Sequence, residues 1–282
     1  MAKNRSGKPA RFVRWRWLTQ LGFLLVWLDP LAQRMHNVCG PVFHCYSCPL
    51  AMFACPIGVL ANFSALHVIP FAALGMLVVF GAAFGSFICG WACPFGFLQD
   101  LIAKIPTPKF ALPLWTGYFR YVVLLAFVLV IPYFWGESHP LFICRLCPAG
   151  AIEGAMPNMA SQAIAGVPIG WPTATKATIL ILVVIAMFFT WRPWCTLFCP
   201  LGAIYGLLNH VSFLFLRFHR DRCIDCADCR SLCLDGGKAE RRVDGLHCVR
   251  CAECTRCRAV TVETVLSHSD KARGDQFSKK GL

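Results

Sequence analysis

Cysteine residues at short, regular spacings constrain what this chain can fold into more than any other feature. Eighteen of its 282 residues are cysteine. Near the C-terminus, one run has the spacing C-x2-C-x2-C-x3-C, and a second run begins fifteen residues after it. The cysteines of these two runs are Cys223, Cys226, Cys229, Cys233, Cys248, Cys251, Cys254 and Cys257. In paired runs of this kind, the fourth thiolate of each run ligates the [4Fe–4S] cluster of the other run. We therefore expect residues 217–266 to form a small ferredoxin-like domain with two [4Fe–4S] clusters, followed by a polar tail over 267–282.

The rest of the chain is unusually apolar. Hydrophobic residues make up 57% of the sequence and charged residues 15%, whereas soluble domains carry about 25% charged residues. Four apolar segments, at 17–33, 68–88, 118–135 and 173–191, have about the 20 residues that a helix needs to cross a bilayer. This pattern predicts an all-α membrane protein with four transmembrane helices.

The positive charge supports an orientation in the membrane. The formal net charge is +13, and basic residues cluster before the first apolar segment and after the last. Such clusters mark the cytoplasmic side of membrane proteins, so we expect both termini in the cytoplasm. No nucleic-acid-binding motif accompanies the charge, so we expect no nucleic acid partner.

The membrane part repeats itself. A C-x2-C-P motif at Cys45 and Cys48 matches one at Cys144 and Cys147, and a C-x3-C-P motif at Cys89 and Cys93 matches one at Cys195 and Cys199. The repeats divide the chain at 1–106 and 107–216. The two halves have the same predicted orientation, which indicates a parallel repeat with shared sites near its axis.

Each half contributes two cysteines of either kind. The C-x3-C set (Cys89, Cys93, Cys195 and Cys199) is predicted at the cytoplasmic face, and the C-x2-C set (Cys45, Cys48, Cys144 and Cys147) at the external face. A cubane cluster takes four thiolates, so we expect one further [4Fe–4S] cluster at the first set and a second at the other. The proline after each C-x3-C motif opens a helix whose N-terminus favours an anionic centre.

Other readings of these cysteines stay open. The C-x2-C set forms disulfides if its side of the membrane is oxidising. Zinc also accepts four thiolates. Cys39 and Cys55 have no counterpart in the second half; they either pair with each other or join Cys45 and Cys48 in a local four-thiolate site.

Taken together, the two C-x3-C-P motifs and the two C-terminal runs resemble the NapH/MauN group of ferredoxin-type membrane proteins. The resemblance implies a multi-pass protein of the bacterial inner membrane that oxidises quinol, or reduces quinone, as the membrane module of a respiratory redox complex. It also implies cytochromes or reductases as partner subunits. Three features depart from the group: the cysteine-rich stretch 39–55, and Leu234 and Arg258 where ferredoxins usually have proline.

Quinol oxidation requires a proton acceptor beside an apolar groove. Ionisable residues at a membrane boundary are candidates for that role. Those near the predicted external face are His44, His67, Glu137 and His139. Interfacial histidines without a catalytic role are an equally good reading of each.

Two rival functions also fit the cysteine content. One is a maturation factor that delivers a metal or reducing equivalents to a partner metalloenzyme. The other is a redox sensor, which is disfavoured because the sequence shows no regulatory output domain. We therefore expect an electron-transfer subunit, and the sequence does not decide whether the chain is an enzyme by itself.

Overall fold

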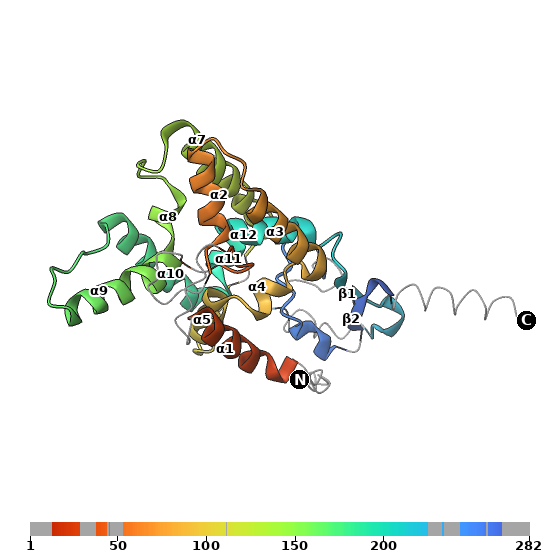
Figure 1. Ribbon diagram of the computed structural model, residues 1–282. Coiled ribbons are helices and arrows are strands. Elements are labelled where there is room, and N and C mark those ends of the chain that lie inside the picture. The colour runs from red at the N-terminus through yellow and green to blue at the C-terminus, as the bar shows by residue number, and fades with distance from the viewer. Residues whose placement is uncertain are drawn as a thin grey trace, which may run out of the picture.

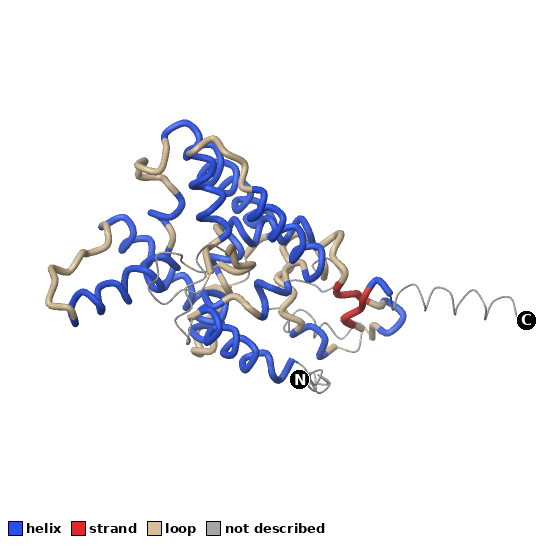
Figure 2. The backbone as a smooth tube through the Cα atoms, in the orientation of Figure 1, coloured by secondary structure: helices blue, strands red, loops and turns tan. Residues whose placement is uncertain are grey.

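The computed structural model describes residues 13–28, 38–43, 45, 53–110, 112–224, 233, 243–257 and 259–266. These residues form a helical body with a two-stranded sheet beside it (Figures 1 and 2). The α-helices are α1 (Arg16–Trp27), α2 (Pro56–Ala65), α3 (Phe71–Phe84), α4 (Phe87–Trp91), α5 (Pro94–Ala103), α6 (Phe119–Val123), α7 (Ile131–Trp135), α8 (Ile143–Leu146), α9 (Met156–Ile164), α10 (Ala174–Phe189), α11 (Pro193–Leu197) and α12 (Pro200–Leu208). The π-helical segments are η3 (Leu124–Val130) and η4 (Gly150–Ala155), and the 3-10 segments are η1 (Val13–Trp15), η2 (Leu114–Tyr118), η5 (Arg220–Arg222) and η6 (Glu253–Arg256).

The prediction of four transmembrane helices is wrong for this structure. Within the described residues, one helix is long and apolar enough to cross a membrane: Trp115–Trp135, with 21 residues and a mean hydropathy of 1.8. Helices α1, α3 and α10 have 12, 14 and 16 residues. At 1.5 Å per residue, even α10 extends only about 24 Å, which is less than the roughly 30 Å of a bilayer core.

Backbone breaks explain why two of the apolar segments give short helices. Helix α3 follows Pro70 and ends at Gly85, which has a φ of +55°. Helix α10 ends at Phe189, because Thr190 has an extended backbone, and Arg192 (φ +44°) and Pro193 follow it. A left-handed residue and a proline both interrupt helical hydrogen bonding, although the segment remains apolar. The predicted assignment of the cysteine sets to opposite membrane faces depended on four spans and falls with them.

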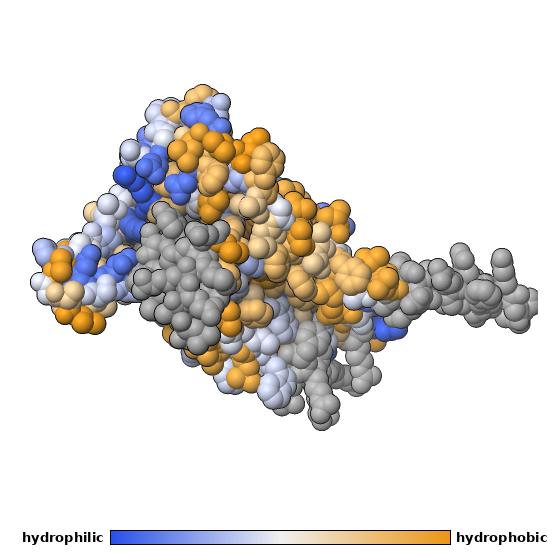
Figure 3. All heavy atoms as spheres, viewed as in Figure 1, coloured by the Kyte–Doolittle hydropathy of each residue, from blue (hydrophilic) through white to orange (hydrophobic). Residues whose placement is uncertain are grey.

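Much of the surface is nevertheless apolar. Large hydrophobic side chains are exposed along α3 and α10, among them Val79 at 65%, Leu182 at 60% and Ile181 at 58%. Figure 3 shows the orange, hydrophobic residues gathered over the helices on one side of the molecule. Contiguous exposed apolar surface of this kind marks an interaction with a membrane or a partner protein.

The C-terminal segment folds back onto the helical body. Strands β1 (Leu214–Phe218) and β2 (Val260–Thr264) pair antiparallel, with Leu216 opposite Val262. Arg250 is fully buried, and its guanidinium donates to Leu214 O at 2.6 Å and Asn209 O at 2.6 Å. The guanidinium also pairs with Asp244. These bonds hold the second C-terminal cysteine run against α12 and β1.

Candidate metal centres

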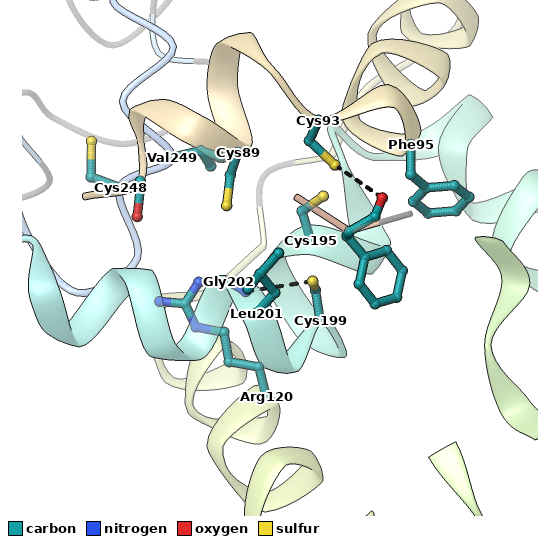
Figure 4. A pocket seen from close by; sticks show the side chains of 12 residues that line it. Cys89, Cys93, Phe95, Arg120, Cys195, Cys199, Leu201, Gly202, Cys248 and Val249 are labelled. Carbon is teal, nitrogen blue, oxygen red and sulfur yellow. Dashed lines mark hydrogen bonds between the residues drawn. The ribbon is translucent and has the colours of Figure 1, made fainter. Parts of the chain in front are cut away.

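The C-x3-C set converges on one pocket. Cys89 lies in α4 and Cys195 in α11, while Cys93 and Cys199 directly precede α5 and α12. All four are buried and line the same pocket, together with Phe43, Arg120 and Cys248. In Figure 4 their side chains approach one another from two separate parts of the chain. The structure therefore brings together the four cysteines that the repeat predicted to share a site.

Each half builds its side of the pocket in the same way. Cys93 and Cys199 have extended backbone, and the proline that follows each occupies the first turn of a helix. The N–H of Gly202 then donates to Cys199 Sγ at 3.5 Å, and the N–H of Gly96 interacts in the same way with Cys93. These N–H groups at a helix N-terminus stabilise negative charge on the sulfur.

Both glycines are required for close approach. A Cβ on Gly96 would lie 3.0 Å from Cys89 O, and one on Gly202 would lie 3.2 Å from Cys195 O. Each C-x3-C loop therefore packs its first cysteine against the helix that its second cysteine begins. The Cys-Pro-x-Gly sequence is the local signal for this turn.

Gln99, which sequence reasoning missed, links the two halves at a sulfur. Its side chain is fully buried in α5, and its Nε2 donates to Cys195 Sγ at 3.0 Å. Trp194 N donates to Gln99 Oε1 at 3.3 Å, which orients the amide. Hydrogen bonds to cluster sulfurs tune the reduction potential of iron–sulfur sites, so Gln99 is placed to tune this one.

A buried ion pair fastens the first C-x3-C loop. Arg192 donates through Nε to Asp100 Oδ1 at 2.7 Å and through Nη1 to Cys89 O at 2.9 Å. Arg16 also pairs with Asp100, and Gln20 donates to Asp100 Oδ2 at 3.1 Å. Sequence reasoning missed Arg192 because its partners lie about a hundred residues away in the chain.

The chemistry of the four thiols fits a cationic cofactor. Burial raises the pKa of Cys89 to about 12, and burial and neighbouring thiols raise the pKa values of Cys93 and Cys199 well above their ordinary value. Four buried thiolates are stable only if positive charge compensates them, as the irons of a cluster do. Within the described part of the chain, no three His, Cys, Asp or Glu side chains form a site for a single metal ion.

The C-terminal runs meet as the ferredoxin pattern predicts. Cys254 interacts electrostatically with Cys251 and Cys248 of its own run and with Cys233, the last cysteine of the other run. This grouping is compatible with the exchange of the fourth thiolate that paired runs make. Cys223 and Cys257 are described, whereas Cys226 and Cys229 lie outside the described residues.

The second run adjoins the C-x3-C set. Trp91 Nε1 donates to Arg250 O at 3.3 Å, and a Cβ on Gly90 would lie 2.8 Å from Val249 O. Cys248 lines the same pocket as Cys89 (Figure 4). The site of the second C-terminal run and the site of the C-x3-C set are thus neighbours, with helix α4 beside both.

The described part of the C-x2-C set also comes together. Cys144 lies in the short helix α8 and Cys147 directly follows it, and Gly150 N donates to Cys147 Sγ at 3.4 Å. Cys45 interacts electrostatically with both. Cys48 lies outside the described residues.

Three of the four predicted proton acceptors lie within the described residues, and none of these three lines one of the apolar cavities found in the helical body. His67 stacks edge-on against Tyr133, and His139 packs against Trp135. Neither these histidines nor the exposed Glu137 line a described cavity, and His44 lies outside the described residues. A cavity of about 450 Å³ lies between α1, α3 and α4 and is lined in part by Ile88, which precedes Cys89 in the chain.

Comparisons with known proteins agree with the cysteine chemistry. The model of a 4Fe–4S binding domain matches residues 66–113 and 177–222. Each match covers one C-x3-C-P motif and ends before Cys223, so the expectation that the ferredoxin-like domain is the C-terminal segment 217–266 alone is wrong. No solved structure matches.

Curated relatives include electron transport and ferredoxin-type proteins. The putative electron transport protein YccM of Escherichia coli is 27% identical over 51% of this chain and 40% of its own length. The ferredoxin-type protein NapH of Haemophilus influenzae is 25% identical over 79% of this chain and 75% of its own. The methylamine utilization ferredoxin-type protein MauN of Methylorubrum extorquens is 29% identical over 64% of this chain and 56% of its own.

Proposed function

Since this chain is an iron–sulfur electron-transfer protein related to the NapH and MauN ferredoxin-type proteins, we propose that it exchanges electrons between a membrane quinol and partner redox subunits. In this proposal the C-x3-C set holds a [4Fe–4S] cluster, and the C-terminal runs hold two more. One observation carries it: four buried cysteines, two from each half, surround a single pocket that also reaches Cys248 of the C-terminal runs.

A bound [4Fe–4S] cluster supplies one-electron storage. The protein's own groups hold it and adjust its charge. The thiols of the C-x3-C set ligate it, and the helix N-termini at Gly96 and Gly202 donate N–H groups to two of the sulfurs. Arg192 and Arg120 both lie close enough to lower the pKa of Cys89, which burial otherwise raises. Two cations therefore offset part of the negative charge of a thiolate-ligated cluster.

The exposed apolar surface supports the membrane part of the proposal, and the cavity between α1, α3 and α4 supports the quinol part. The cavity of about 450 Å³ is lined mostly by aromatic and aliphatic side chains, among them Phe80 and Trp91. Cavities of roughly 300–1,000 Å³ are typical of small-molecule sites. Its lining includes Ile88 of α4, the helix that also carries Cys89, so a quinone ring there would lie against the helix that presents one cysteine of the C-x3-C set.

A pair of single variants tests whether the two halves share one cluster. Cys93→Ser and Cys199→Ser should each remove the same low-temperature EPR species from the detergent-purified full chain. The double variant should lose no more than either single variant, because residues of one site act non-additively. Cys39→Ser is the matched control and should keep that species.

Two results would contradict the proposal. Separate, additive losses in the two variants would mean that the halves do not share a cluster. Substoichiometric iron that a chelator removes from the wild type would favour metal delivery over electron transfer. Retained iron without electron transfer from a quinol analogue would remove only the quinol part.

A further inference from the structure

The turn that begins the C-x3-C helices occurs four times in the chain. Cys93 and Cys199 each start a Cys-Pro-x-Gly sequence, and so do Cys55 and Cys147. Helix α2 begins at Pro56, directly after Cys55, with the same extended cysteine and the same proline in the first turn. The N–H of Gly58 interacts with the Cys55 thiol as that of Gly150 does with Cys147, where the distance is 3.4 Å.

The two additional turns face each other. Cys55, Cys144 and Cys147 pack into one hydrophobic cluster. A Cβ on Gly150 would lie 3.5 Å from Cys45 Sγ, which places Cys45 beside the turn of Cys147. The four thiols are near one another: Cys144 and Cys45 are close enough to add to the effect of burial on the pKa of Cys55, and Cys45, Cys55 and Cys144 to that on the pKa of Cys147.

We propose that Cys45, Cys55, Cys144 and Cys147 form a second four-thiol site for a [4Fe–4S] cluster, with Cys55 as a ligand instead of Cys48. This site has the construction of the C-x3-C site. Two of its cysteines begin Cys-Pro-x-Gly turns, one in each half, and the other two precede those turns: Cys45 in a loop and Cys144 in the short helix α8. The proposal extends the proposed function but depends on a different set of residues.

The surroundings of this second site suit a negatively charged cluster. Lys176 Nζ lies 3.2 Å from the position of a Gly150 Cβ, and its charge lowers the pKa of Cys144 against the larger effect of burial. Lys176 therefore corresponds to the arginines beside the C-x3-C set. Cys45 N donates to Glu153 Oε2 at 3.0 Å, which fixes the backbone that presents the Cys45 thiol.

The two sites are near neighbours. Phe43 lines the C-x3-C pocket, and its carbonyl oxygen lies 3.8 Å from Cys93 Sγ. Cys45 follows Phe43 by two residues, so their Cα atoms are at most about 7 Å apart. If each site held a cluster, the two clusters would be close together. An electron released by one cluster would then be accepted by the other.

The test compares Cys55→Ala with Cys48→Ala in the full chain, purified in detergent without oxygen. Iron, acid-labile sulfide and low-temperature EPR are measured for each. Cys55→Ala should lose about four irons and one EPR species relative to the wild type, because a cubane holds four irons. Cys48→Ala should keep both. The species that depends on Cys93 and Cys199 should persist in both variants, which separates this test from that of the proposed function.

Cys144→Ala guards against misfolding, because Cys144 is only half-buried, whereas Cys55 is buried, and no Cys-Pro-x-Gly turn begins at it. It should lose the same EPR species as Cys55→Ala, and the double variant should lose no further iron. Three results would overturn the proposal: loss of the species in Cys48→Ala but not in Cys55→Ala, wild-type iron in both Cys55→Ala and Cys144→Ala, or a disulfide among the four cysteines in protein with full iron content.

Discussion

Gln99 offers a direct test of how the fold tunes the C-x3-C site. Replacing it with leucine removes the N–H that donates to Cys195 Sγ at 3.0 Å and leaves a side chain of similar size. Reduction adds negative charge to a cluster and its thiolates, so a hydrogen bond to a sulfur stabilises the reduced state more than the oxidised state. Gln99→Leu should therefore lower the midpoint potential.

The size of the shift follows from the strength of the bond. A hydrogen bond to a charged group contributes about 1.5–3 kcal/mol, and only part of it distinguishes the two redox states. If that part is about 1 kcal/mol, the one-electron potential falls by about 40 mV, since a tenfold change corresponds to about 59 mV. Gln99→Glu should lower the potential further, because a carboxylate replaces the donor beside the sulfur.

An EPR-monitored redox titration of the full chain measures this shift. Gln162→Leu is the matched control, because Gln162 of α9 only accepts a hydrogen bond, at 2.8 Å, from Gly170 N in the exposed loop that follows this helix. It should leave the midpoint unchanged. An unchanged or raised midpoint in Gln99→Leu, with the EPR species intact, would refute the reasoning.

Two further variants test the contacts around the first C-x3-C loop. Gly90→Ala should loosen the C-terminal segment, because the new Cβ would lie 2.8 Å from Val249 O. Limited proteolysis should cut that segment faster than it does in the control Gly75→Ala, whose Cβ would meet nothing within 4 Å. Asp100→Asn should lower the melting temperature, because it removes the charged partner of buried Arg192. Removing one partner of a buried ion pair costs about 3–5 kcal/mol. A melting temperature equal to that of the wild type would argue against the ion pair. Burial raises the pKa of Asp100, but Arg192 and Arg16 more than offset this, so its folded-state pKa is lowered. Its stabilisation should be complete above about pH 4, and should be lost as the pH falls through the folded-state pKa.

Local sequence signals predicted which residues lie near one another at the sites. Spacing groups the cysteines of each motif, and the structure places Cys233 near the second C-terminal run. The proline after Cys93 and Cys199 predicted where helices α5 and α12 begin. These features depend on neighbours within a few residues, which a sequence displays directly.

Hydropathy located the helices but overestimated their length. An apolar segment reads as a span whether or not its backbone stays helical, and the left-handed Gly85 breaks the segment 68–88, while the extended Thr190 ends α10 after 16 residues. The predicted separation of the cysteine sets by a bilayer fails for the same reason. Phe43 contacts Cys93 and lies two residues from Cys45, so the two sets are close together.

The sequence by itself determined the donor atoms, their short-range grouping and the repeated turns, because spacing and proline act along the chain. Only the tertiary structure decided which groups meet. Cys55 faces Cys147 across ninety-two residues of chain, and Gln99 reaches Cys195 across ninety-six. Such partners are chosen by how the helices pack, and packing depends on the shape of every side chain in the core and not on any motif near the residue.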